Sequence, residues 1–142
     1  MYIGIRLVGV SSRLRQTQHI FKGHQRSFKT CSVLRDTFTI QDEEDFKSKV
    51  LNSDVPVIVD FTATWCGPCK ILGPRLDAAV AATESKVNLA IVDIDENGDL
   101  ALDHRVNAVP TVVAFKDGEI VDKFVGLIDE DKLDAFITKL HT

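Results

Sequence analysis

The chain has 142 residues, of which 44% are hydrophobic and 27% charged, a composition that indicates one globular domain. No apolar run approaches the roughly 20 residues that a membrane-spanning helix needs, so we expect no membrane insertion. The net charge of −4 hides an asymmetry, because residues 1–35 contain seven basic residues and no acid, whereas residues 36–142 contain ten basic and 21 acidic residues. The acidic part is unsuited to nucleic acid, whose affinity comes largely from Lys and Arg on phosphate.

Residues 1–35 have the composition of an organelle transit peptide, being rich in Arg and Ser and free of acids. Apolar residues recur along one face of a potential helix, at Ile3, Leu7, Val10 and Leu14. A secretory signal fits worse, because Arg6 interrupts the only candidate apolar core. We therefore predict an organelle transit peptide that is cleaved between about residues 25 and 36 and that carries Cys31 with it. The alternative is a basic tail that stays attached.

Strand and helix patterns alternate along residues 36–142. In chain order we expect a strand at 37–40, a helix at 42–52, a strand at 55–61, a helix opened by CGPC (66–69) and running to about 84, a strand at 87–95, a helix at 98–106, two strands within 109–126 and a helix at 129–140. The strands at 55–61 and 87–95 are almost continuously apolar, as in sheets that are covered on both faces. Asp117-Gly118 is a typical hairpin turn. This order predicts an α/β fold with a mixed central sheet and helices on both faces.

Two cysteines stand in the stretch TATWCGPCK (62–70), directly after the buried strand at 55–61, where open α/β sheets carry functional turns. A zinc site needs four ligands, which are usually Cys or His in two closely spaced pairs. Cys66 and Cys69 form one such pair, but the histidines outside the first 35 residues, His104 and His141, do not form a second. A purely structural disulfide would enclose two residues and would restrict the unfolded chain little. The third interpretation is a dithiol that cycles between reduced and oxidised forms.

The dithiol has a mechanism that follows from its position at the start of a helix. Unpaired N–H groups and the helix dipole at Cys66 would favour the thiolate, which is the attacking species. Cys66 would attack a substrate disulfide, and Cys69, less than one turn away, would then displace the reduced substrate. Pro68 is compatible with this place, because the first helical turn has spare N–H groups. We therefore predict that Cys66 is the nucleophile and Cys69 the resolving cysteine.

Residues 36–142 resemble the thioredoxins in the motifs VDFTATWCGPCK (59–70), AVPT (108–111) and KFVG (123–126). The mitochondrial branch of that family is similar to this chain in three segments, which are residues 1–35, CKILGPRL (69–76) and VDKFVG (121–126). The resemblance implies a thioredoxin-like fold and a protein-disulfide reductase that holds no metal and no bound cofactor. Electrons would come from NADPH through a separate thioredoxin reductase and pass to disulfide-containing proteins such as peroxiredoxins. It also implies that the transit peptide is mitochondrial and that the protein acts in the mitochondrial matrix. A monomer is the default oligomeric state, and dimerisation through an apolar platform beside the cysteines is the alternative.

Asp60 is an acid inside an apolar strand, where burial should raise its pKa. The resemblance implies that Asp60 lies behind Cys69 and exchanges its proton during the second displacement. Thioredoxins often carry a lysine near this acid in the next buried strand, but this chain has Ile91 at the matching position. Without that cation, we expect Asp60 to stay protonated to higher pH.

The resemblance further implies a shallow platform that receives the substrate, formed by Trp65, Gly67, Pro68, Val109, Pro110 and Gly126. In this platform the Val109–Pro110 bond would be cis and would expose the Val109 backbone to a bound peptide. Two other functions remain open. One is an oxidase or isomerase with the same chemistry, although isomerases usually have a histidine in place of Pro68. The other is a binding module that holds a partner on the platform, with the dithiol regulating that grip.

Overall fold

A computed structural model describes residues 37–84 and 86–141, so the predicted transit peptide and Cys31 lie outside the described residues. The strands are β1 (Thr37–Thr39), β2 (Val57–Thr62), β3 (Asn88–Asp93), β4 (Thr111–Lys116) and β5 (Glu119–Val125). The helices are α1 (Glu43–Phe46), the π-helical η1 (Lys47–Leu51), α2 (Gly67–Ala81), α3 (Gly98–Asp103) and α4 (Glu130–His141). None of the helices in the described part of the chain is both long and apolar enough to cross a membrane.

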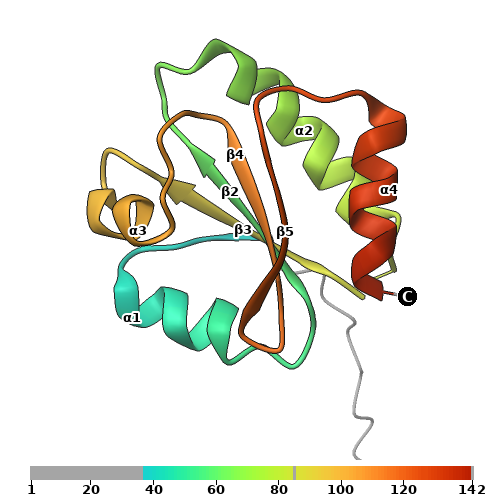
Figure 1. Ribbon diagram of the computed structural model, residues 1–142, viewed down its shortest axis with the longest axis horizontal. Coiled ribbons are helices and arrows are strands. Elements are labelled where there is room, and N and C mark those ends of the chain that lie inside the picture. The colour runs from blue at the N-terminus through green and yellow to red at the C-terminus, as the bar shows by residue number, and fades with distance from the viewer. Residues whose placement is uncertain (1–36, 85, 142) are drawn as a thin grey trace, which may run out of the picture. The chain divides into compact units, whose positions relative to one another are not determined.

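The five strands form one mixed sheet in the order β1-β3-β2-β4-β5 (Figure 1). β3 pairs in parallel with both β1 and β2, because the helical connections return the chain to the end of the sheet where the preceding strand began. β4 is antiparallel to both β2 and β5. The mixed sheet predicted from the sequence is confirmed, and the central strand is β2, whose carboxyl end leads into the two cysteines.

Helices cover both faces of the sheet, as predicted (Figure 1). On one face, Phe46 and Val50 of the first helical segment and Leu100 of α3 pack on a cluster that includes Phe61 and Phe115. On the other face, buried residues of α2 and α4 pack on the sheet; they include Leu72, Leu76, Val80, Leu133, Phe136, Ile137 and Leu140. Burial of these two apolar layers supplies the main stabilisation of the fold.

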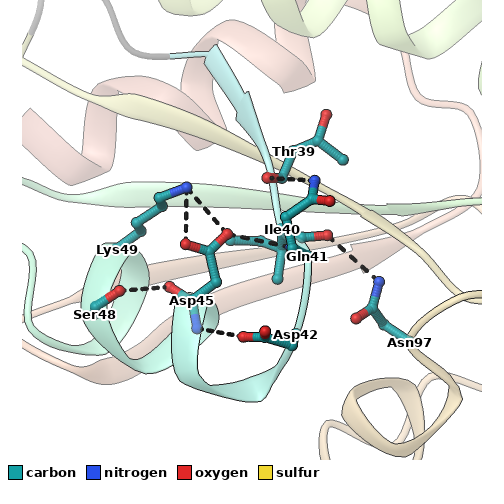
Figure 2. A network of polar contacts seen from close by, with 8 residues as sticks. All are labelled: Thr39, Ile40, Gln41, Asp42, Asp45, Ser48, Lys49 and Asn97. Carbon is teal, nitrogen blue, oxygen red and sulfur yellow. Dashed lines mark hydrogen bonds and ion pairs between the residues drawn. The ribbon is translucent and has the colours of Figure 1, made fainter.

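The first helix begins at a network of polar contacts that Figure 2 shows from close by. The Asp42 carboxylate accepts a hydrogen bond of 2.8 Å from the Asp45 N–H, which is the usual role of an N-cap residue. The Asp45 carboxylate in turn accepts from the Gln41 N–H at 3.2 Å and from the Lys49 ammonium at 3.0 Å. The buried Asn97 donates to the Ile40 carbonyl at 3.4 Å, and so ties the end of β1 to the loop before α3.

Three helix boundaries differ from the prediction. The segment predicted as one helix at 42–52 widens after Phe46, and Asn52 N–H bonds the Lys47 carbonyl five residues back. The helix expected to reach about residue 84 ends at Ala81, and Glu84 has a positive φ of 54°. The helix expected at 98–106 ends at Asp103, because Arg105 adopts a left-handed conformation with φ of 52°.

The predicted hairpin at Asp117-Gly118 is confirmed. Both residues have positive φ, 54° and 79°, as turns between right-twisted antiparallel strands require. Any side chain at Gly118 would also bring its Cβ within 3.0 Å of the Leu51 carbonyl oxygen. The strand pairing slips by one residue between Ala114 and Phe115, so β5 contains a bulge.

Candidate active site

The two cysteines lie at the start of α2, just after the carboxyl end of the central strand β2. Cys66 is the N-cap residue, with an extended backbone conformation, and Gly67 and Pro68 form the first helical turn. The Cys66 sulfur accepts a hydrogen bond of 3.2 Å from the Cys69 N–H. A free N–H group of the helix therefore points at the sulfur that the sequence predicts as the nucleophile. Such an arrangement favours the thiolate form of this sulfur in the reduced protein.

The cysteines are joined as a disulfide, with Cα atoms 5.4 Å apart, and both are nearly buried. They pack with Ala63 from the turn after β2 and with two partly buried residues, Ile94 and Val109. The structure therefore brings Val109 against the two cysteines, although it lies 40 or more residues after them in the chain. Among the described residues, no group of three or more His, Cys, Asp or Glu side chains is arranged to hold a metal ion.

Asp60 is a buried carboxyl group in the middle of β2, with 4% of its surface exposed. Its Oδ1 atom has no hydrogen-bond partner. Burial away from water raises the pKa of Asp60 from 3.8 to about 6, because the charged form loses its hydration. Side chains alternate along a strand, so Asp60 lies on the same face as Ile58, the face covered by α2 and α4.

Apolar residues flank Asp60 on both neighbouring strands. Ile91 of β3 is its direct partner on one side and Val112 of β4 on the other. Direct partners on adjacent strands place their side chains on the same face of the sheet. The expectation from the sequence that Ile91 stands beside Asp60 is thus confirmed, and neither direct partner offers a positive charge or a hydrogen bond.

Trp65 precedes the first cysteine and projects into solvent, with 66% of its surface exposed. Its indole Nε1–H donates a hydrogen bond of 3.0 Å to the Asp95 carboxylate in the loop after β3. Asp95 is itself held by a bond of 2.9 Å from its N–H to the Asp93 carboxylate. The loop after β3 therefore fixes the orientation of the indole ring.

The Val109–Pro110 peptide bond is cis, as the family resemblance implies, and it immediately precedes β4. The Gly126 N–H donates a hydrogen bond of 2.8 Å to the Pro110 carbonyl, so the structure joins these two predicted platform positions. Gly126 has φ of 85°, a conformation that strains any residue with a Cβ. Thr111 adds a bond of 2.6 Å from its hydroxyl to the Ala108 carbonyl.

Reasoning from the sequence missed the residues that support the site from other segments. Asp95 fixes Trp65, and Ile94 packs on the disulfide. Lys123 donates to two backbone carbonyls at the end of α3. No spacing in the sequence links Asp95, Ile94 and Lys123 to the cysteines. The pairing of β2 with β3 brings the loop after β3 close to the disulfide, and Lys123 comes from β5, which pairs with β4.

Comparisons with known proteins agree with this geometry. The thioredoxin family model matches residues 37–139. A curated relative from Bos taurus, "Thioredoxin, mitochondrial", is 54% identical over 138 residues, which cover 92% of this chain and 83% of the relative. "Probable thioredoxin-2" of Caenorhabditis elegans is 44% identical and covers 95% of this chain and 86% of its own length. The crystal structure of Malassezia sympodialis thioredoxin (Mala s 13) is similar with a TM-score of 0.69 at 37% identity, over 77% of this chain and 94% of that one.

The fold and the buried cysteine pair at a helix N-terminus define a thiol–disulfide oxidoreductase with a thioredoxin-like fold. With the family model and relatives above, this chain belongs to the thioredoxin family. It is a protein-disulfide reductase whose redox group is the Cys66–Cys69 pair, and this family works with a disulfide in place of a bound cofactor.

Proposed function

We propose that this protein carries electrons to disulfide-containing proteins in the mitochondrial matrix. The relatives named as mitochondrial thioredoxins support the organelle, and the basic, acid-free composition of residues 1–35 supports a transit peptide there. The family resemblance supports NADPH and a thioredoxin reductase as the source of electrons. It also supports peroxiredoxins among the substrates. In this proposal the protein acts as a monomer.

The observation that carries the proposal is the position of Cys66. In the reduced protein its thiolate attacks one sulfur of a substrate disulfide and forms a mixed disulfide, while the second substrate sulfur leaves as a thiolate and takes up a proton. Cys69 then loses its proton and attacks the Cys66 sulfur. The remaining substrate sulfur leaves and is protonated, and the Cys66–Cys69 disulfide forms. Two electrons have moved from the cysteine pair to the substrate.

Asp60 accepts the Cys69 proton in this scheme. A pKa of about 6 supports the role, because the group can hold or release a proton near neutral pH. Its place on the sheet face that α2 covers supports it as well, since α2 carries Cys69. The substrate chain lies across Trp65, Gly67, Pro68, Val109, Pro110 and Gly126 and pairs with the exposed backbone of Val109.

The test couples the full chain to NADPH and a mitochondrial thioredoxin reductase, with insulin as the disulfide substrate. NADPH consumption should be steady, and Cys66→Ser should abolish it. Cys69→Ser should instead accumulate a covalent mixed disulfide with insulin that dithiothreitol releases. If Cys69→Ser turns over insulin as fast as the unchanged protein, the assignment of the resolving cysteine is wrong.

A further inference from the structure

The segment between α3 and β4, residues 104–110, carries Val109 and Pro110 at its end, and we call it the cis-proline segment. It begins where α3 closes. The N–H groups of Arg105 and Val106 bond the carbonyls of Leu102 and Ala101 at 3.0 and 2.8 Å. With Arg105 in the left-handed region, this is a Schellman closure. The closure pairs the N–H groups of Arg105 and Val106 with helix carbonyls, but the His104 and Arg105 carbonyls have no partner in the helix.

Lys123 of β5 supplies that partner. Its ammonium donates to the His104 carbonyl at 3.0 Å and to the Arg105 carbonyl at 3.2 Å. A cation at this place also complements the negative end of the helix. Within the described part of the chain, no carboxylate lies within ion-pair distance of Lys123, although the acidic side chains greatly outnumber the basic ones.

The other end of the cis-proline segment is held by the residue that follows β5. Gly126, three residues after Lys123, donates its N–H to the Pro110 carbonyl at 2.8 Å. β5 and the residue after it therefore hold the segment at both ends, and Val109 lies between the two attachments.

The His104 side chain adds a probe of this arrangement. Its ring packs against Phe46 and Phe115, with centroids 4.9 and 5.5 Å away. Burial lowers the pKa of His104, Asp103 acts in the opposite direction, and the positive charge of Lys123 lowers it further. The imidazole pKa therefore reports whether the ammonium lies over the start of the segment.

We propose that Lys123 is a positioning residue that holds the cis-proline segment in the conformation that receives a disulfide-bearing protein chain. The inference rests on the proposed role of the Val109 backbone in substrate binding. An extended substrate needs this backbone to be in place before it binds, because ordering the segment during binding costs affinity. A small disulfide needs only access to the cysteine sulfur, so its reduction does not depend on Lys123.

The experiment uses the full chain, reduced in advance and mixed with an excess of either insulin or cystine. Oxidation is followed by the fluorescence of Trp65, which is the single tryptophan of the sequence. Lys123→Met removes both hydrogen bonds of the ammonium. Because both bonds are exposed to solvent, it should lower the second-order rate constant with insulin about fivefold and leave the rate with cystine unchanged. Lys123→Arg should restore most of the insulin rate, since guanidinium N–H groups reach the same carbonyls.

Lys116→Met is the matched control, because Lys116 is an exposed lysine at the end of the neighbouring strand β4 and its loss removes the same charge. The His104 pKa, measured by NMR titration, should rise in Lys123→Met and not in the control. The proposal is overturned if Lys123→Met keeps the insulin rate, loses both rates equally, or leaves the His104 pKa unchanged.

Pro110→Ala separates this inference from the proposed function. If Pro110→Ala leaves the insulin rate unchanged, the substrate role of the segment fails and the inference fails with it. If Pro110→Ala slows insulin but Lys123→Met does not, only the role of Lys123 is refuted.

Discussion

Replacement of Asp60 by Asn should stabilise the protein at neutral pH. Asp60 is buried, its Oδ1 atom has no hydrogen-bond partner, and Ile91 and Val112 flank it. Its pKa is raised from 3.8 to about 6 by desolvation. A difference of one pH unit between folded and unfolded pKa values corresponds to about 1.4 kcal/mol, so the ionised carboxylate destabilises the fold by about 3 kcal/mol.

The sign of the effect gives it a defined pH window. Below the unfolded pKa of 3.8 the carboxyl is neutral in both states and costs nothing. Between 3.8 and about 6 the unfolded chain releases its proton while the folded protein keeps it, so stability falls as the pH rises. Above about 6 both states are ionised and the destabilisation is complete. Asn has a similar shape and never ionises, so its advantage should appear only as the pH rises through this window.

The assay is urea unfolding of the oxidised protein at about pH 7.5 and about pH 4, followed by circular dichroism. Asp60→Asn should raise the free energy of unfolding by about 3 kcal/mol at the higher pH and by less than about 1 kcal/mol at the lower. Glu96→Gln, at an exposed loop position, is the control and should change stability by less than about 0.5 kcal/mol at either pH. If the Asn variant is no more stable than the unchanged protein at neutral pH, or if its gain in unfolding free energy does not depend on pH, the buried Asp60 carboxylate does not destabilise the fold.

Three further substitutions test the surroundings of the site. Ile91→Lys places a cation on the strand position directly beside Asp60, and NMR titration should find the Asp60 pKa lower by at least about one pH unit; an unchanged value would show that the two side chains do not interact. Asp95→Ala removes the acceptor of the Trp65 indole and should broaden and shift the tryptophan emission, whereas Asp95→Asn keeps an acceptor oxygen and should change the emission less. Equal spectra for the two variants would contradict the orienting role of Asp95. Gly126→Ala forces a Cβ into a backbone with φ of 85° and should cost about 1–2 kcal/mol in urea unfolding; a loss near zero would mean that the backbone relaxes freely.

Local patterns in the sequence determine most elements of this protein. The apolar run before TATWCGPCK predicts the buried central strand, and Asp117-Gly118 predicts the hairpin, because both depend on residues close together in the chain. The placement of Cys66 at a helix start follows in the same way. The ends of the helices were less predictable. The end of α3 depends on the left-handed conformation of Arg105, and arginine gives no signal for that conformation.

The sequence by itself determined the chemistry of this protein, because a pair of cysteines separated by Gly and Pro at a helix N-terminus is a local arrangement. Only the tertiary structure decided the environment of that chemistry. The raised pKa of Asp60 depends on its burial in the sheet and beneath α2, and the orientation of Trp65 depends on Asp95, which is 30 residues away. The cis-proline segment is attached to β5 through Lys123 and to the residue after β5, Gly126. Such contacts arise from strand order and register, which are set by packing across the whole sheet and leave no trace in local residue spacing.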